Sequence, residues 1–87
     1  MRRTEITNSF KRDFRKYSAF DMAFVEAVWK LANHDPLPER FCDHALTGDW
    51  IDHRDCHIKP DLVLIYRKPD DKILQLVRLG SHSELGL

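Results

Sequence analysis

The sequence predicts an α+β fold whose elements run in the order strand, helix, helix, strand, strand, strand. Apolar residues recur at helical spacing through the first third of the chain, whereas β-rich apolar runs fill the last third. The proline-containing segment 33–38 separates the two parts, because proline removes an amide donor and biases the preceding residue toward extended backbone. We therefore expect helices first and most of the sheet afterwards.

The N-terminal part is expected to hold one short strand and two helices. Arg3–Thr7 is the strand candidate, and the cap-type residues Thr7, Asn8 and Ser9 precede the first helix. Phe10, Phe14 and Tyr17 recur on its apolar face.

The second helix carries a longer apolar stripe. Ser18 is its expected cap, and we expect Met22 and Trp29 to lie in the core with Phe24. The stripe consists of Phe20, Phe24, Ala27, Val28 and Leu31.

The C-terminal part is expected to supply the remaining strands. Asp49–Ile58 is predicted as a strand or a bent pair, and Asp61–Arg67 as a central strand covered on both faces, because it is continuously apolar. Lys68–Asp71 has proline at its second position, as turns often do. Lys72–Leu79 then returns as the next strand and completes a hairpin.

Length and charge narrow the classes of function. The 87 residues suit one domain, 1–87, and the formal net charge is zero, whereas nucleic-acid-binding proteins usually show a basic excess. Any affinity for phosphate must then come from a local patch, which by default is a solvated helix face but is also a candidate surface for RNA, the ribosome or a protein inhibitor. The patch comprises Arg2, Arg3, Lys11, Arg12, Arg15 and Lys16.

Targeting and cysteine signals favour a reduced, cytoplasmic protein. No apolar leader or membrane-length segment is present, so no membrane partner is expected. The two cysteines do not form a disulfide framework. Cys56 lies beside His57, but adjacent strand residues point to opposite faces, so the pair does not suit one metal ion. We expect neither a metal site nor a cofactor.

Three histidines and one aspartate are the strongest candidates for chemistry. His44, His57, Asp61 and His82 each fall at the edge of a predicted strand, where a small sheet can bring distant side chains together. Histidine exchanges protons near neutral pH, and several histidines beside a carboxylate are typical of general acid–base catalysis. Each one alone is more often a surface residue, so the prediction depends on their joint placement.

Four segments carry a family resemblance. They are D-H-x-L-x-G-x-W at Asp43–Trp50, R-D-x-H-I-x-P-D at Arg54–Asp61, L-I-Y at Leu64–Tyr66 and R-x-G-S-H at Arg78–His82. In order and spacing they resemble the YafQ branch of the RelE/ParE superfamily, the ribosome-dependent mRNA-cleaving toxins of bacterial toxin–antitoxin pairs.

The resemblance implies a RelE-like fold, with the two N-terminal helices packed on one face of a small, mostly antiparallel sheet. It places the family's catalytic residues at His44, His57, Asp61 and His82, and a supporting arginine at Arg78. Arg54, in the second segment, is expected to bind substrate with Arg78. The implied partners are a cognate antitoxin, the ribosome and mRNA, with operator DNA contacted only through the antitoxin.

Two positions depart from the family pattern. Leu62 stands where a family tryptophan follows the aspartate, and Gly86 stands where a family phenylalanine lies. Aromatic side chains stack on bases, so we expect these departures to affect substrate binding and codon preference more than the cleavage reaction itself.

The expected chemistry uses the RNA's own 2′-hydroxyl as nucleophile. Asp61 or His57 would act as the base, His82 as the acid and Arg78 as a phosphate clamp, while His44 would orient or share the proton transfer. Two alternatives stay open: a non-enzymatic inhibitor of DNA gyrase like the ParE branch, and an inactive regulatory subunit.

Overall fold

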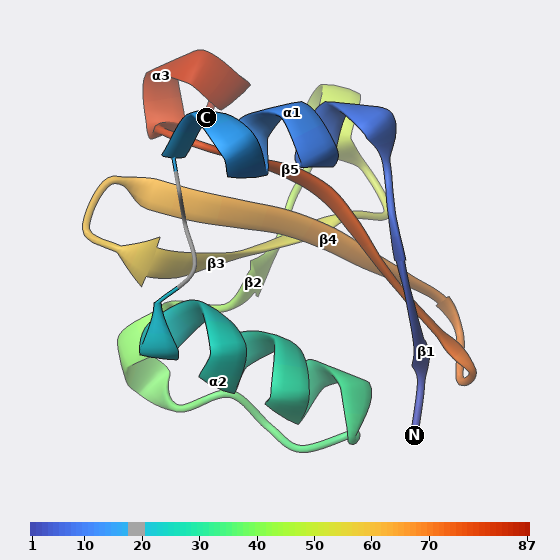
Figure 1. Cartoon of the computed structure of the whole chain (residues 1–87). Coiled ribbons are helices and arrows are strands. Elements are labelled where there is room, and N and C mark those ends of the chain that lie inside the picture. The colour runs from blue at the N-terminus through green and yellow to red at the C-terminus, as the bar shows by residue number, and fades with distance from the viewer. Residues whose placement is uncertain (18–20) are drawn as a thin grey trace.

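The computed structural model describes residues 1–17 and 21–87. It shows a five-stranded sheet with two longer helices on one side and a short helix on the other (Figure 1). The described elements are β1 (Arg3–Ile6), α1 (Asn8–Tyr17), α2 (Met22–Ala32), the 3₁₀ turn η1 (Glu39–Phe41), β2 (His44–Ala45), the 3₁₀ turn η2 (Gly48–Trp50), β3 (Arg54–Lys59), β4 (Leu62–Asp70), β5 (Ile73–Gly80) and α3 (His82–Leu85).

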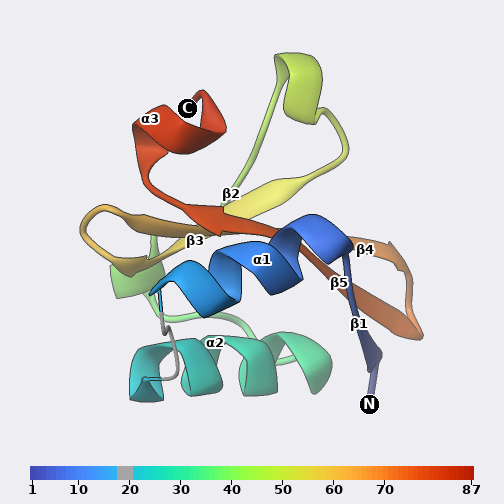
Figure 2. The same ribbon diagram turned by 45° about the horizontal axis from the view of Figure 1, so that its top comes forward.

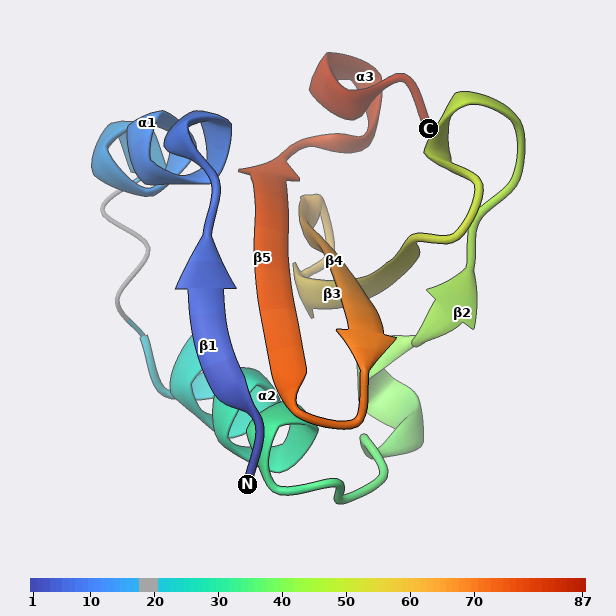
Figure 3. The same cartoon turned by 90° about the vertical axis from the view of Figure 1, so that its right-hand side faces the viewer.

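The strand order is β1-β5-β4-β3-β2, and Figure 3 shows β1, β5 and β4 side by side. β1 runs parallel to β5, and every other neighbouring pair is antiparallel. The predicted α+β class and mostly antiparallel sheet are confirmed. β4 lies at the centre, and its first five residues are all buried, as the continuous apolar run predicted.

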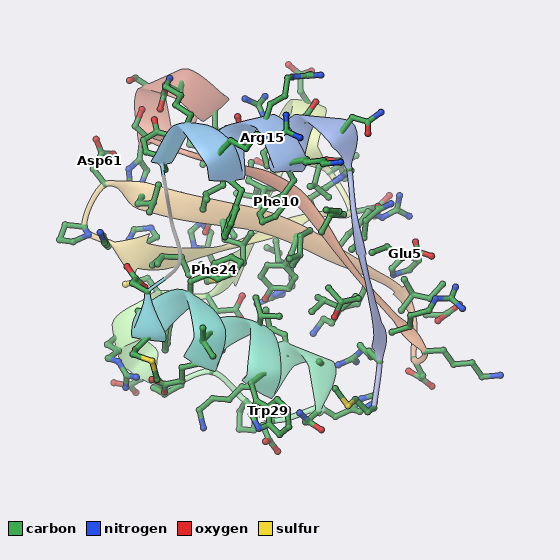
Figure 4. All side chains as sticks on the ribbon, in the orientation of Figure 1. Glu5, Phe10, Arg15, Phe24, Trp29 and Asp61 are labelled. Carbon is green, nitrogen blue, oxygen red and sulfur yellow. The ribbon has the colours of Figure 1, made fainter. Side chains whose placement is uncertain are left out.

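Helices α1 and α2 cover the same face of the sheet (Figure 2). Phe10 of α1 lies 6.1 Å from Phe24 of α2 between ring centroids, and Phe14 lies 5.5 Å from Phe24. Figure 4 shows Phe10 and Phe24 in the layer between the helices and the sheet. Below them Leu64 and Tyr66 of β4 are fully buried, so the helix-side core joins both helices to the central strand.

The helix starts follow capping rules, with one correction. The Thr7 hydroxyl accepts the amide of Phe10 at 3.0 Å, as expected for a cap. α2 begins at Met22 and is capped by Asp21, whose carboxylate accepts the amide of Phe24. The predicted cap Ser18 and the predicted core residue Phe20 lie outside the described residues.

The prediction that Met22 and Trp29 lie in the core is wrong. Their exposed fractions are 77% and 61%, and Figure 4 shows Trp29 on the outer side of α2. The buried stripe is set by Phe24, Ala27 and Leu31, at spacings of three and four residues. Trp29, two residues from both Ala27 and Leu31, therefore faces away from the sheet.

The predicted strand or bent pair at Asp49–Ile58 is only partly correct. Its first residues form η2, and β3 begins at Arg54. Gly48 and Asp52 have φ angles of +66° and +69°, which turn the chain out of extended geometry. β2, at His44–Ala45, pairs with the start of β3 instead.

The face of the sheet opposite α1 and α2 has a smaller apolar cluster. Val63 and Ile65 are fully buried there beneath Leu85 of α3, with Trp50 packed beside them. The Trp50 indole donates to the carbonyl of Leu85 at 3.0 Å, which ties η2 to α3. α3 had not been predicted, and it frames the candidate site.

Candidate active site

His82 and Asp61 form the best-defined pair of the site. His82 Nδ1 lies 2.7 Å from Asp61 Oδ1, and the same oxygen accepts the backbone amide of His82 at 3.1 Å. The side-chain hydrogen bond from His82 and the backbone one hold the pKa of Asp61 below its ordinary value. Since Nδ1 faces the carboxylate, Nε2 is the nitrogen left for a substrate.

The placement of this pair follows from its local sequence. Asp61 lies in the turn between β3 and β4, at the end of the sheet seen in Figure 4, and His82 is the first residue of α3. The helix is fixed by a capping box, in which Ser81 accepts the amide of Glu84 and Glu84 accepts that of Ser81. Glu84 also forms an ion pair with Lys16 at 2.5 Å, which connects α3 to α1.

His57 joins the pair from β3. Its ring centroid lies 4.9 Å from that of His82, with an interplanar angle of 80°. It points to the α3 side of the sheet, opposite its fully buried neighbour Cys56, as strand alternation predicted. Among the described residues, no group of three or more His, Cys, Asp or Glu is arranged to hold a metal ion.

His44 belongs to the same face through its pairing with β3. It stands opposite Asp55 in the β2–β3 register. Its Nδ1 donates to the carbonyl of Cys42 at 2.8 Å and lies 3.0 Å from Asp55 Oδ1. The bond to the carbonyl fixes the Nδ1 proton, so Nε2 is again the free nitrogen.

Asp55 is a component of this site that sequence analysis missed. It is 2% exposed, and within the described residues Oδ1 makes no hydrogen bond. Burial raises the pKa of Asp55, while the nearby His44, His57 and His82 act in the opposite direction. The available signal was its position two residues before His57, which places both on the same face of a strand.

Arg78 lies on β5, opposite Ile65 of β4. Its Nε donates to Asp13 Oδ2 at 2.7 Å and its Nη2 to Oδ1 at 3.3 Å, and Asp13 also accepts the amide of Leu79. Burial alone would raise the pKa of Asp13, but these hydrogen bonds hold it below its ordinary value. Arg78 thus anchors α1 to β5, and its remaining N–H donors are what it can offer a phosphate.

Arg54 is not brought to the histidines. Its side chain lies on the helix side of β3, where Nε and Nη2 contact Asp43 at 3.3 and 3.4 Å. The buried Tyr66 hydroxyl donates to the same carboxylate. This arrangement gives Arg54 a structural partner, and its role in substrate binding stays a prediction.

The N-terminal basic patch is also separate from the histidine cluster. Lys11, Arg12, Arg15 and Lys16 are exposed on the outer face of α1, where Figure 4 shows Arg15. Arg2 is partly buried and donates to the carbonyl of Leu31 at 2.7 Å, and Arg3 pairs with Glu5. Only the α1 part of the patch is a continuous exposed cationic surface.

The two departures from the family pattern have different surroundings. Leu62 is 7% exposed and belongs to the helix-side core, so it presents no surface to a base. Gly86 ends α3 with a φ of +72°, a conformation that side chains rarely adopt. Neither position supplies a stacking surface.

Comparisons with known proteins agree with this fold. The model of the family described as the YafQ bacterial toxin of type II toxin–antitoxin systems matches residues 2–86. The chain belongs to the YafQ toxin family.

Curated relatives share substantial identity. A putative YafQ toxin from Haemophilus influenzae is 45% identical over 67 residues, which cover 74% of this chain and 66% of the relative. The YafQ mRNA interferase toxin of Escherichia coli K12 is 48% identical over 50 residues, which cover 58% of this chain and 53% of the relative. The chain therefore spans between half and two thirds of the length of these relatives.

Solved structures match over nearly the whole chain. A copper-bound mutant toxin from Helicobacter pylori has a TM-score of 0.89 and 45% identity, with 98% of this chain and 99% of that chain covered. YafQ in the E. coli DinJ–YafQ complex has a TM-score of 0.82 and 34% identity, with 98% of each chain covered. Imidazole is a common copper ligand. Because no group of three or more His, Cys, Asp or Glu among the described residues is arranged to hold a metal ion, we assign no step to one.

In the part of the chain that the structure describes, no helix is long and apolar enough to cross a membrane.

Proposed function

We propose that this protein is an endoribonuclease that cleaves mRNA on the ribosome. The observation that carries the proposal is the cluster of His44, His57 and His82 with Asp55 and Asp61 at one end of the sheet. The E. coli relatives are named mRNA interferase toxins, which supports the same reaction class.

The proposed reaction is transesterification by the RNA itself. A base removes the proton of the 2′-hydroxyl, whose oxygen attacks the adjacent phosphorus, and the 5′-oxygen leaves with a proton from an acid. The products are a 2′,3′-cyclic phosphate and a 5′-hydroxyl. General acid and base groups typically contribute about 10²–10⁴-fold each.

We assign the acid to His82. Asp61 holds its Nδ1 at 2.7 Å, so Nε2 is directed at the substrate. The lowered pKa of Asp61 makes this carboxylate a weak base. Of the two candidates for the base, this favours His57, which lies beside His82, with His44 orienting the hydroxyl.

Arg78 is proposed to stabilise the phosphorane. A guanidinium forms charge-assisted hydrogen bonds with phosphate that strengthen as negative charge develops. Its anchorage to Asp13 reduces the side-chain freedom that would be lost on binding.

We also propose a protein antitoxin as the natural inhibitor. YafQ of E. coli was solved in complex with DinJ, and a segment that folds on binding can cover a large exposed site. The antitoxin would mediate any contact with operator DNA, and the toxin would act in the cytoplasm, where ribosomes and mRNA are found.

Expression without the antitoxin tests the proposal. Growth should stop because translation stops, which pulse labelling with an amino acid measures directly. DNA supercoiling in the same cells is the control. Arrest with continued translation and altered supercoiling would instead indicate a gyrase inhibitor, and undisturbed growth would indicate an inactive subunit.

A further inference from the structure

Asp55 holds a buried carboxylate that takes no part in the proton transfers assigned to His57 and His82. It is 2% exposed, and within the described residues its Oδ1 accepts no hydrogen bond. A buried carboxylate without a hydrogen-bond partner lowers the stability of the fold, and an apolar side chain of similar size would avoid that cost. Titratable groups in such surroundings cluster at functional sites, so Asp55 is a candidate for a role in the reaction.

The position of Asp55 in the sheet places its charge between an apolar layer and the histidines. Its neighbours on the adjacent strands are His44 of β2 and Ile65 of β4. Ile65 is fully buried in the cluster beneath Leu85 of α3. Asp55 also lies two residues before His57, on the same face of β3. Because the apolar side excludes water, the charge of Asp55 acts on the histidines with little screening.

The contact between Asp55 and His44 is one of charge and not a hydrogen bond. His44 Nδ1 lies 3.0 Å from Asp55 Oδ1, but its proton is directed at the carbonyl of Cys42, 2.8 Å away. The Cys42 carbonyl therefore fixes the ring and its tautomer whether or not Asp55 is charged. What Asp55 adds is a negative charge, which favours a second proton on the ring.

Four titratable groups surround Asp55, and they come from β2, β3, α3 and the residue before β2. Burial raises the pKa of Asp55, whereas the positive forms of His44, His57 and His82 act in the opposite direction, and Asp43 adds to the rise. Coupling between sites is reciprocal, so the same interactions favour the protonated forms of the histidines. The three histidines thus share one buried negative charge.

We propose that Asp55 is a positioning residue whose buried charge stabilises the positive charge that the histidine cluster gains when it takes the proton of the 2′-hydroxyl. The inference rests on the proposed ribonuclease function. In that reaction the hydroxyl oxygen keeps the electron pair with which it attacks phosphorus, and the proton passes to His57. Asp55 itself neither gains nor loses a proton in this step, and it acts only through the histidines.

Asp55→Asn tests the proposal, because it keeps the shape of the side chain and removes its charge. On ribosomes programmed with defined mRNA, kcat at pH 7 should fall roughly 10–100-fold, the scale for loss of the carboxylate partner of a metal-bound imidazole, while KM stays unchanged. The fall in rate toward acidic pH should also move about one unit lower, because histidines lose their protons more readily without the neighbouring charge.

Asp61→Asn is the matched control for the pH effect. The Asp61 side chain is 70% exposed, so water screens its charge, and it contacts the proposed acid rather than the base. Asp61→Asn should therefore slow cleavage without moving the fall in rate toward acidic pH. NMR titration of the histidine rings in the free protein adds a readout that needs no substrate. The His44 midpoint should move to lower pH in Asp55→Asn and stay in place in Asp61→Asn.

The two proposals fail in different ways. If the wild-type protein does not cleave mRNA, the proposed function is wrong and the inference falls with it. If it cleaves and Asp55→Asn keeps the native rate, Asp55 has no part in the reaction. A lower rate in Asp55→Asn, without a shift of the fall in rate and of the His44 midpoint, would make Asp55 a structural residue and would also overturn the inference.

Discussion

His82 donates from Nδ1 to Asp61 Oδ1 at 2.7 Å, and its backbone amide contacts the same oxygen at 3.1 Å. Two bonds to one oxygen fix both the ring orientation and the tautomer of the histidine. They also stabilise the ionised carboxylate, which lowers the pKa of Asp61. We therefore propose that Asp61 positions His82 rather than acting as the base.

The pH dependence of cleavage should separate these two roles. We expect the cleavage rates of wild type and of Asp61→Asn to fall in the same way toward acidic pH, because the proposed base is a histidine, with Asp61→Asn slower throughout. Cleavage rates on ribosome-bound mRNA from pH 4 to 9 provide the measurement. Loss of this fall in Asp61→Asn alone would make Asp61 the base.

Arg78 and Asp13 provide a matched pair of variants. Arg78→Ala and Asp13→Ala each break the same ion pair, and each should reduce the free energy of unfolding by about 1–3 kcal/mol. Arg78→Ala should also lose roughly 10²-fold in cleavage, since it removes a cation from the phosphate. Equal losses of cleavage in the two variants would reduce Arg78 to a structural role.

The stability contributed by Asp13 should depend on pH. Its native pKa is lowered, so its stabilising effect is present above the unfolded-state pKa and is lost as pH falls through the native value. The difference in free energy of unfolding between wild type and Asp13→Asn should therefore shrink on acidification from pH 7. Urea unfolding at several pH values checks this, and a difference that is constant with pH would contradict it.

Asp55 should behave in the opposite way. Its pKa is raised by burial, so its ionised form destabilises the fold at neutral pH, and this cost disappears as pH falls through the native value. Asp55→Asn should raise the free energy of unfolding at pH 7 by an amount on the order of 1 kcal/mol, and by less in acid. Destabilisation by Asp55→Asn at pH 7 would show that its contacts with the histidines outweigh burial.

The exposed α1 surface should contribute to antitoxin binding. Lys11→Glu combined with Arg15→Glu should weaken the complex and reduce its dependence on salt, whereas Lys72→Glu, at the exposed β4–β5 turn, should not. Titration calorimetry at two salt concentrations measures both effects. A stoichiometric complex that cleaves mRNA at full rate would contradict the inhibitor role itself.

The central strand and the order of the longer elements, without β2 and α3, were predictable because their signals are local. The run at Leu62–Tyr66 is continuously apolar, and its burial on both faces follows directly. Trp29 was wrongly predicted to be buried because only its apolar character was considered. Which side of a helix is buried depends on the strands that the helix covers. α3 was missed because four residues give too little periodicity, although Ser81 and Glu84 form a recognisable capping box.

Within the site, His44, His57, Asp61 and His82 were predicted from residue type and resemblance, and the structure places the three histidines near Asp55 and pairs His82 with Asp61. Asp55 was not predicted, because its place opposite His44 depends on the β2–β3 pairing, which the sequence did not indicate. The ion pairs of Arg54 with Asp43 and of Arg78 with Asp13 could not be predicted either, because each joins residues that are not neighbours in the sequence.

End-group analysis of cleaved mRNA, with wild type and His82→Ala on programmed ribosomes, tests the proposed chemistry most directly. Wild type should leave a 2′,3′-cyclic or 3′-phosphate and a 5′-hydroxyl, and only when ribosomes are present. His82→Ala should bind ribosomes normally and lose about 10²–10⁴-fold in rate, because it lacks the proton donor. A 5′-phosphate product, or cleavage by His82→Ala at the wild-type rate, would contradict the mechanism.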